Sequence, residues 1–106
     1  MINWARVDEL RNEIGQEGFD EIVDIFLEEV EQVLAKLRDT PDRKTLREDL
    51  HFLKGCALNL GFSELASRCQ AGETACAQGE AGSVDVPAVL KAYSNSKLEF
   101  VNGLES

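Results

Sequence analysis

A chain of 106 residues has room for one domain around a single hydrophobic core, which excludes two independently folding domains. Hydrophobic residues make up 43% of it and charged residues 29%, a balance that excludes a disordered chain and is typical of a soluble globular protein. The formal net charge of -9 at pH 7 opposes binding to nucleic acid or to an anionic membrane surface.

Apolar residues recur at helical spacing in almost every segment between turn signals, and no stretch alternates apolar and polar residues as a strand does. The sequence therefore predicts an all-α fold. A short first helix is predicted over about residues 4–14, and the glycine-flanked segment 15–18 ends it. A second helix is predicted over residues 19–37, because its apolar residues form a wide arc typical of a face packed on a core.

The third helix carries the clearest buried stripe. Thr40 is predicted to cap its N-terminus, with Pro41 at the first helical position, so that the helix covers about residues 42–60. Gly61 is suited to end it in the left-handed conformation. The apolar residues that recur along it at steps of four and three are Leu46, Leu50, Leu53, Ala57 and Leu60.

Two more helices complete the chain, over about residues 63–78 and 86–104. The positions predicted to face inward are Phe62, Leu65, Ala66, Cys69, Gly72 and Cys76 in the first of these, and Val86, Leu90, Tyr93, Phe100, Val101 and Leu104 in the second. Because the connections are short, neighbouring helices should pack antiparallel. The predicted fold is an antiparallel up-down four-helix bundle in one domain, with the short additional N-terminal helix capping one end.

His51 interrupts the pattern of the third helix, because it lies about 145° from the centre of the leucine stripe when each residue turns by about 100°. Its imidazole should therefore face outward. Gly55, one turn later, has no side chain to cover it, although glycine inside a helix costs about 1 kcal/mol relative to alanine. We expect that something approaches His51 closely; the alternative is a surface histidine beside an incidental glycine.

Glu73 is a second anomaly, since the fourth helix places it on the predicted inward face, where a charge without a partner is costly. His51 lies ten residues before Gly61 and Glu73 twelve residues after it, so antiparallel helices bring the two to similar heights. We predict that Glu73 accepts a hydrogen bond from the His51 ring. Such a bond places the proton on Nδ1 and leaves the Nε2 lone pair outward as a nucleophile.

Basic residues gather near His51 on an otherwise acidic chain. Lys54 lies on the flank of the exposed helical face, and Lys44 and Arg47 lie on or near the same face. The Nε2 nitrogen of His51 can attack phosphorus, and Lys54 would then offset the charge on the phosphoryl oxygens. Lys44 and Arg47 would make the strip around Lys54 locally basic. For Lys44 and Arg47 the alternative is an ordinary solvated helix face.

Residues 51–61, His-Phe-Leu-Lys-Gly-Cys-Ala-Leu-Asn-Leu-Gly, resemble the signature of the histidine phosphotransfer (HPt) domain family, His-x-Leu-Lys-Gly followed by small residues and a closing glycine. The resemblance implies that His51 is phosphorylated, that Lys54 assists the phosphoryl group, and that Gly55 gives a partner access. The family also tends to carry Gln or Glu on the following helix, bonded to the histidine ring, and Glu73 occupies that place.

The resemblance implies a phosphorelay intermediate, which takes a phosphoryl group from the aspartyl phosphate of a response-regulator receiver domain and passes it to another receiver. A hybrid sensor histidine kinase is a further candidate partner. The Mg²⁺ is expected on the receiver, so this chain should bind no cofactor. Because the sequence has no Gly-rich nucleotide loop, we expect a phosphocarrier and not a stand-alone kinase. Docking is expected around His51, with contacts from Leu58, Ile22 and Ile25.

The expected location is the cytoplasm. No apolar run in the sequence approaches the about 20 residues that span a bilayer. The first residues also lack the basic and then apolar layout of a signal peptide. We therefore expect a monomer with neither a membrane nor a nucleic acid as its partner.

Two other functions stay open at this point. The bundle could bind a receiver or a sensor kinase as a non-catalytic adaptor. A redox or metal-binding bundle would use Cys56, Cys69 and Cys76, but these form no Cys-x-x-Cys pair, and only His51 could complete a metal site with them. We expect the three thiols to pack as small core residues and to bind no metal. Cys56 is a mild departure from the resemblance, because the family would have Ser or Ala at its position.

Overall fold

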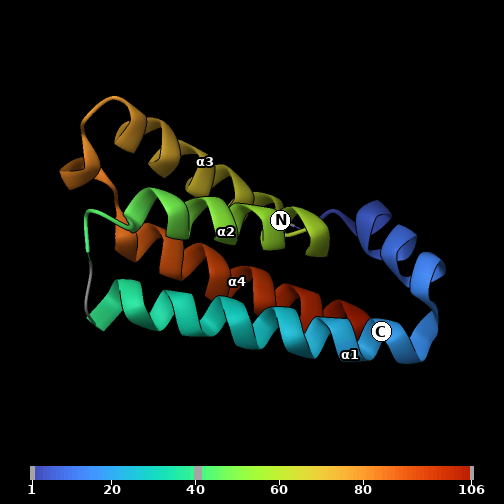
Figure 1. Cartoon of the computed structure of the whole chain (residues 1–106). Helices are drawn as coiled ribbons and strands as arrows, with labels where there is room; N and C mark the ends of the chain where they lie inside the picture. The colour runs from blue at the N-terminus through green and yellow to red at the C-terminus, as the bar shows by residue number, and fades with distance from the viewer. Residues whose placement is uncertain (1, 40–41, 106) are drawn as a thin grey trace.

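The computed structural model describes residues 2–39 and 42–105, and within them the chain is an all-α bundle, as predicted. The elements are α1 (Trp4–Asp39), α2 (Leu46–Leu60), α3 (Ser63–Ala77), the 3-10 helix η1 (Ala81–Ser83) and α4 (Val86–Glu105). The long part of α1 and the other three α-helices run side by side and alternate in direction (Figure 1). None of the helices in the described ranges combines the length and the apolar character that crossing a membrane requires.

A break at Gly15 divides α1 into a short arm before it and a long arm after it. Gly15 has φ 77° and ψ 165°, a backbone conformation that is strongly disfavoured for every residue except glycine. The short arm lies across one end of the bundle (Figure 1). The two helices predicted over residues 4–14 and 19–37 are therefore present, but one residue separates them where the sequence suggested four.

The short arm is fastened to two other parts of the fold. The Asn3 amide donates a hydrogen bond to the Gly61 carbonyl oxygen at 2.7 Å, at the turn between α2 and α3. The Trp4 ring stacks on that of Phe100 in α4, with 6.0 Å between the ring centroids. Gly103 leaves the space that the indole fills, since a Cβ there would collide with it. These contacts keep the short arm over the end of the bundle that it was predicted to cap.

The start of α2 differs from the prediction. The helix begins at Leu46 and not near residue 42, because Asp42 organises a turn instead. Its carboxylate accepts a hydrogen bond from the Lys44 amide at 2.9 Å, and its carbonyl oxygen accepts one from the Thr45 amide at 3.1 Å. The predicted capping residues, Thr40 and Pro41, lie outside the described part of the chain. Helix α2 ends at Gly61 with φ 76°, as predicted.

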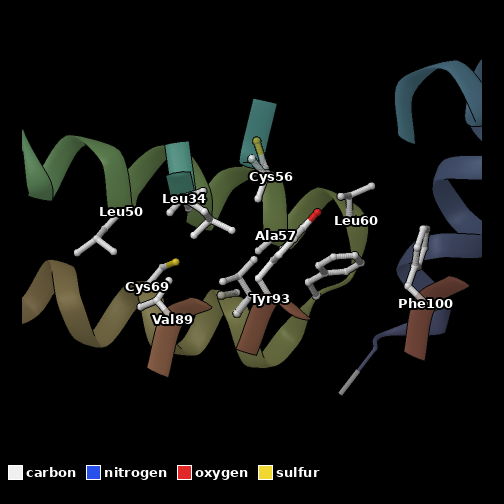
Figure 2. Close-up of a cluster of buried hydrophobic side chains, with 14 of the residues drawn as sticks. Leu34, Leu50, Cys56, Ala57, Leu60, Cys69, Val89, Tyr93 and Phe100 are labelled. Carbon is white, nitrogen blue, oxygen red and sulfur yellow. The ribbon is translucent and has the colours of Figure 1, made fainter. Parts of the chain in front are cut away.

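The predicted stripe of α2 is buried along its whole length. All five of its residues belong to the core cluster, together with residues of every other α-helix. Figure 2 shows Leu50 and Ala57 of α2 among Leu34 of α1, Cys69 of α3 and Tyr93 of α4. Because this face of α2 is fixed against the core, the opposite face, which carries His51, is fixed toward solvent.

The predicted buried face of α4 is wrong at its C-terminal end. Val101 and Leu104 are exposed, at 37% and 36%. The inward face is completed by small residues, because Ala92 and Ser96 are fully buried there and Gly103 faces the Trp4 ring. Val89 is buried as well, so the true inward face is turned to one side of the predicted one, and part of it consists of small residues that a pattern of large apolar residues does not mark.

Candidate functional site

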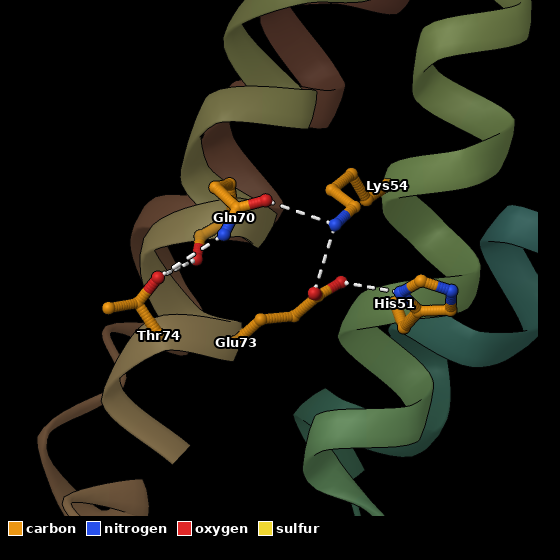
Figure 3. Close-up of polar contacts among 5 residues, drawn as sticks. All are labelled: His51, Lys54, Gln70, Glu73 and Thr74. Atoms are coloured by element: carbon orange, nitrogen blue, oxygen red, sulfur yellow. Dashed lines mark hydrogen bonds and ion pairs between the residues drawn. The ribbon is translucent and has the colours of Figure 1, made fainter. Parts of the chain in front are cut away.

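The α2–α3 hairpin brings His51 and Glu73 together although 22 positions separate them in the chain. His51 Nδ1 lies 3.1 Å from Glu73 Oε1 (Figure 3). The contact that the helical spacing predicts is therefore present. The His51 side chain keeps 73% of its surface exposed, whereas that of Glu73 keeps 13%. A mostly buried carboxylate thus holds one edge of a ring whose remaining surface faces solvent.

This contact determines which ring nitrogen carries the proton in the neutral imidazole. A carboxylate can only accept a hydrogen bond, so Nδ1 must be the donor. Nε2 then has an unshared electron pair. Figure 3 shows the second nitrogen of His51 on the far side of the ring from Glu73. Such a nitrogen can attack an electrophile that arrives from outside the protein.

Lys54 lies close to this pair, but its ammonium is already engaged. Nζ donates hydrogen bonds to Glu73 Oε2 at 3.0 Å and to Gln70 Oε1 at 3.0 Å (Figure 3). The Lys54 side chain is only 20% exposed. The two oxygens of Glu73 therefore bind two different donors, the imidazole and the ammonium. In this structure Lys54 compensates the charge of Glu73, at a place one helical turn from His51.

Gly55 has no structural need to be glycine within the described part of the chain. A Cβ built on it would meet nothing within 4 Å, and its backbone is in the middle of a regular helix. The glycine therefore costs helix stability without relieving a collision inside the molecule. Because Gly55 has no side chain, no atoms beyond the backbone cover the outer surface of α2 at this position beside His51.

The predicted basic strip is smaller than the sequence suggested. Arg47 lies in the first turn of α2, four residues before His51, and its side chain is exposed. Lys44 is also exposed, but it lies in the turn before α2 and not on the helix. Because Lys54 is paired with Glu73, Arg47 is the predicted cation that shares a helical face with His51 and points to solvent.

The predicted docking residues differ in how much surface they offer. Leu58 of α2 is 57% exposed and Ile25 of α1 is 52% exposed, both high values for large aliphatic side chains. Ile22 is partly buried and packs against the core cluster. Its contribution to a docking surface is therefore smaller than predicted.

Three residues near the site were missed by sequence reasoning: Phe52, Gln70 and Thr74. Phe52 directly follows His51 and is 40% exposed, and its place off the leucine stripe was the available signal. Gln70 lies three residues before Glu73 and thus on the same side of α3. It also borders a groove of about 370 Å³ lined by Lys54, Leu58, Ser63, Ala66, Ser67 and Gln70.

The cysteines give no support to a redox or metal site. Cys56 and Cys69 are buried, Cys76 is partly buried, and all three are free thiols. Burial raises the pKa of the Cys69 thiol to about 12, which keeps it protonated and unreactive. No group of three or more His, Cys, Asp or Glu side chains in residues 2–39 and 42–105 is arranged to hold a metal ion.

Comparison with known proteins agrees with this geometry. The family model described as "Hpt domain" matches residues 21–100, which include most of the long arm of α1, all of α2 and α3, and most of α4. No curated protein and no solved structure matches the chain. Because the matched range covers well over half of the sequence, the chain belongs to the Hpt domain family, whose members have a histidine phosphotransfer role in phosphorelays.

Proposed function

We propose that this chain carries a phosphoryl group on His51 Nε2, taking it from the aspartyl phosphate of one receiver domain and passing it to another. The observation that carries the proposal is the exposed imidazole whose Nδ1 is bonded to a mostly buried carboxylate. Transfer between two proteins requires a nucleophile with a fixed tautomer that an incoming partner can reach. His51 meets both requirements.

The chemistry is balanced without any proton transfer. The Nε2 lone pair forms the N–P bond while the P–O bond of the aspartyl phosphate breaks, and the bonding electrons stay on the aspartate oxygen. Nδ1 keeps its proton, so the ring becomes cationic. Glu73, whose Oε1 lies 3.1 Å from Nδ1, stabilises that cation and orients the ring. The same steps in reverse return the phosphoryl group to a second receiver.

The receiver is proposed to dock over Gly55. Because a Cβ at this position would meet nothing inside the protein, its absence benefits only a partner. Leu58, Phe52 and Ile25 would supply the exposed apolar contacts that suit a transient interface. Arg47, with Lys44 nearby in the chain, would add positive charge. The Mg²⁺ and much of the charge neutralisation are proposed to come from the receiver.

A direct test uses purified receiver domains charged with radiolabelled acetyl phosphate. The chain should take up label that is lost in acid and retained in alkali, as expected of phosphohistidine. His51→Gln removes the nucleophile from an exposed position, so it should fold like the wild type and stay unlabelled. The same mixtures run on a sizing column show whether the chain acts as a monomer.

The remaining candidate is an adaptor that binds a receiver without accepting phosphate. An adaptor would form a complex with the receiver, with wild type and His51→Gln binding equally well and neither gaining label. That result would reject the phosphotransfer proposal.

We propose that the carrier works in the cytoplasm, where fractionation of cells should recover it.

A further inference from the structure

The Lys54 ammonium is held between two acceptors of α3. Glu73 Oε2 and Gln70 Oε1 each lie 3.0 Å from Nζ. A lysine side chain has four rotatable bonds and normally keeps its head in water, so a single fixed position is entropically costly. Two acceptors from adjacent turns of one helix define that position beside His51.

Gln70 is itself held in one orientation. Its side-chain Nε2 donates a hydrogen bond to Thr74 Oγ1 at 3.2 Å, and the Thr74 hydroxyl donates one to the main-chain carbonyl oxygen of Gln70 at 3.0 Å (Figure 3). An ammonium only donates, so the amide oxygen must face Lys54 and the amide nitrogen must face Thr74. The order Thr74, Gln70, Lys54, Glu73, His51 is therefore one continuous chain of hydrogen bonds.

We propose that Gln70 is a positioning residue, which retains the Lys54 ammonium beside the imidazole when phosphorylation of the ring weakens the bond between that ammonium and Glu73. This inference rests on the proposed phosphotransfer to His51. Attack by Nε2 leaves the ring cationic with its proton still on Nδ1, so the negative charge of Glu73 is now balanced by the ring. Its attraction for Lys54 weakens at the moment when phosphoryl oxygens arrive nearby.

The neutral amide of Gln70 is unaffected by this redistribution of charge. It keeps one hydrogen bond to the ammonium, while the bond to Glu73 is replaced by one to a phosphoryl oxygen. Lys54 therefore starts toward the transferred group from one defined position, and does not have to search through its free rotamers. No residue of the site has to gain or lose a proton in this exchange.

The test replaces Gln70 by methionine, which has a similar shape and no acceptor for the ammonium. Phosphoryl transfer from a charged receiver is measured in single-turnover experiments over a range of receiver concentrations. The maximal rate should fall about tenfold in Gln70→Met, because one hydrogen bond to a charged group is lost. The half-saturating receiver concentration should not change. Thr74→Val, which removes only the support of Gln70, should show a smaller loss.

Gln78→Met is the matched control, because Gln78 is exposed at the C-terminal cap of α3. This variant should transfer the phosphoryl group at the wild-type rate. A second readout is the ¹H–¹⁵N NMR signal of the Lys54 ammonium, assigned by its loss in Lys54→Met. A hydrogen-bonded ammonium exchanges slowly with water, so the signal should be present in the wild type and lost in Gln70→Met.

Three results would overturn the inference. One is a wild-type rate together with an unchanged ammonium signal in Gln70→Met. Another is an unchanged maximal rate with a higher half-saturating concentration, which would make Gln70 a docking contact. If the wild type itself takes up no label, the proposed function fails and the inference falls with it, and the ammonium signal then reports a purely structural contact.

Discussion

Gly72 of α3 lies directly against Leu50 of α2, so closely that a Cβ on Gly72 would come within 2.6 Å of Leu50 Cδ1. Their next neighbours in the chain are Glu73 and His51. The two helices therefore pack tightly against each other at the level of the site. The 3.1 Å contact between Glu73 Oε1 and His51 Nδ1 is made across this closely packed pair of helices.

Gly72→Ala should lower both stability and transfer. Leu50 is fully buried, so the added methyl group must displace its side chain or push the two helices apart. We expect a loss of about 1–2 kcal/mol in the free energy of unfolding, even after the helix propensity gained from alanine. Urea unfolding measures it. An increase in stability would mean that Leu50 rotates away at no cost.

Gly55→Ala should have the opposite effect on stability. The new methyl group meets nothing inside the protein, so the free energy of unfolding should rise by about 1 kcal/mol. Phosphoryl transfer should nevertheless slow, with a higher half-saturating receiver concentration, because the methyl group stands where the partner docks. Measured side by side, the two glycine variants separate packing from access. Unimpaired transfer by Gly55→Ala would remove Gly55 from the proposed docking face.

Two substitutions of Glu73 separate its two proposed tasks. Glu73→Gln keeps an oxygen that accepts from Nδ1 but has no charge to stabilise the cationic ring, whereas Glu73→Ala loses both. We expect transfer to slow by about tenfold in the first and by more in the second. Glu80→Gln, in the exposed loop after α3, is the control. Equal rates in all four proteins would show that the contact has no part in the reaction.

The hydrogen bonds that Glu31 of α1 accepts from Tyr93 and Lys97 of α4 should make stability depend on pH in the acid range. Hydrogen bonds from Lys97 at 2.6 Å and from the Tyr93 hydroxyl at 2.5 Å lower the pKa of Glu31 below its ordinary value. A lowered pKa in the folded state stabilises the protein above the pKa of the unfolded chain, and this contribution is lost as the pH falls through the folded pKa.

Glu31→Gln should therefore be less stable than the wild type at neutral pH, and the difference should shrink as the pH falls below the ordinary pKa of glutamate and through the lowered pKa of Glu31. The effect is expected to be modest, because nearly half of the Glu31 side chain is exposed to screening solvent. Unfolding curves at several pH values measure it, with Glu28→Gln as the control. A difference that stays constant down to low pH would show that the charge of Glu31 contributes nothing.

Ser96→Ala should stabilise the bundle. The Ser96 side chain is fully buried in α4, and its hydroxyl has no hydrogen-bond partner among the described residues. Removing such a group avoids the cost of keeping it from water, which is about 1 kcal/mol or more. Thermal unfolding should show a higher midpoint. A lower midpoint would indicate that the hydroxyl has a partner in solution, such as a buried water molecule.

The sequence was sufficient for the site's central contact because two simple rules determine it. A strict stripe from Leu46 to Leu60 fixes which face of α2 is buried, so His51 had to point outward. A tight turn at Gly61 then fixes the heights of residues on the two antiparallel helices. Both rules depend on backbone geometry, which periodicity reports well.

Features that depend on individual side chains were not predictable in this way. The start of α2 depends on hydrogen bonds that the Asp42 side chain and carbonyl make locally. The inward face of α4 depends on small residues such as Ala92 and Ser96, which a hydropathy pattern does not mark. The position of Lys54 depends on which acceptors its flexible side chain meets on α3. Each needs the packed structure to be known first.

The chain contains one tryptophan, Trp4, and that residue lies at the junction between the short arm of α1 and the end of α4. Its fluorescence therefore reports on one joint of the molecule without any label. Undocking of the arm would expose the indole to water and shift its emission to longer wavelength, while the rest of the bundle could stay folded. The protein thus contains a natural optical probe for whether this end of the bundle opens before the remainder unfolds.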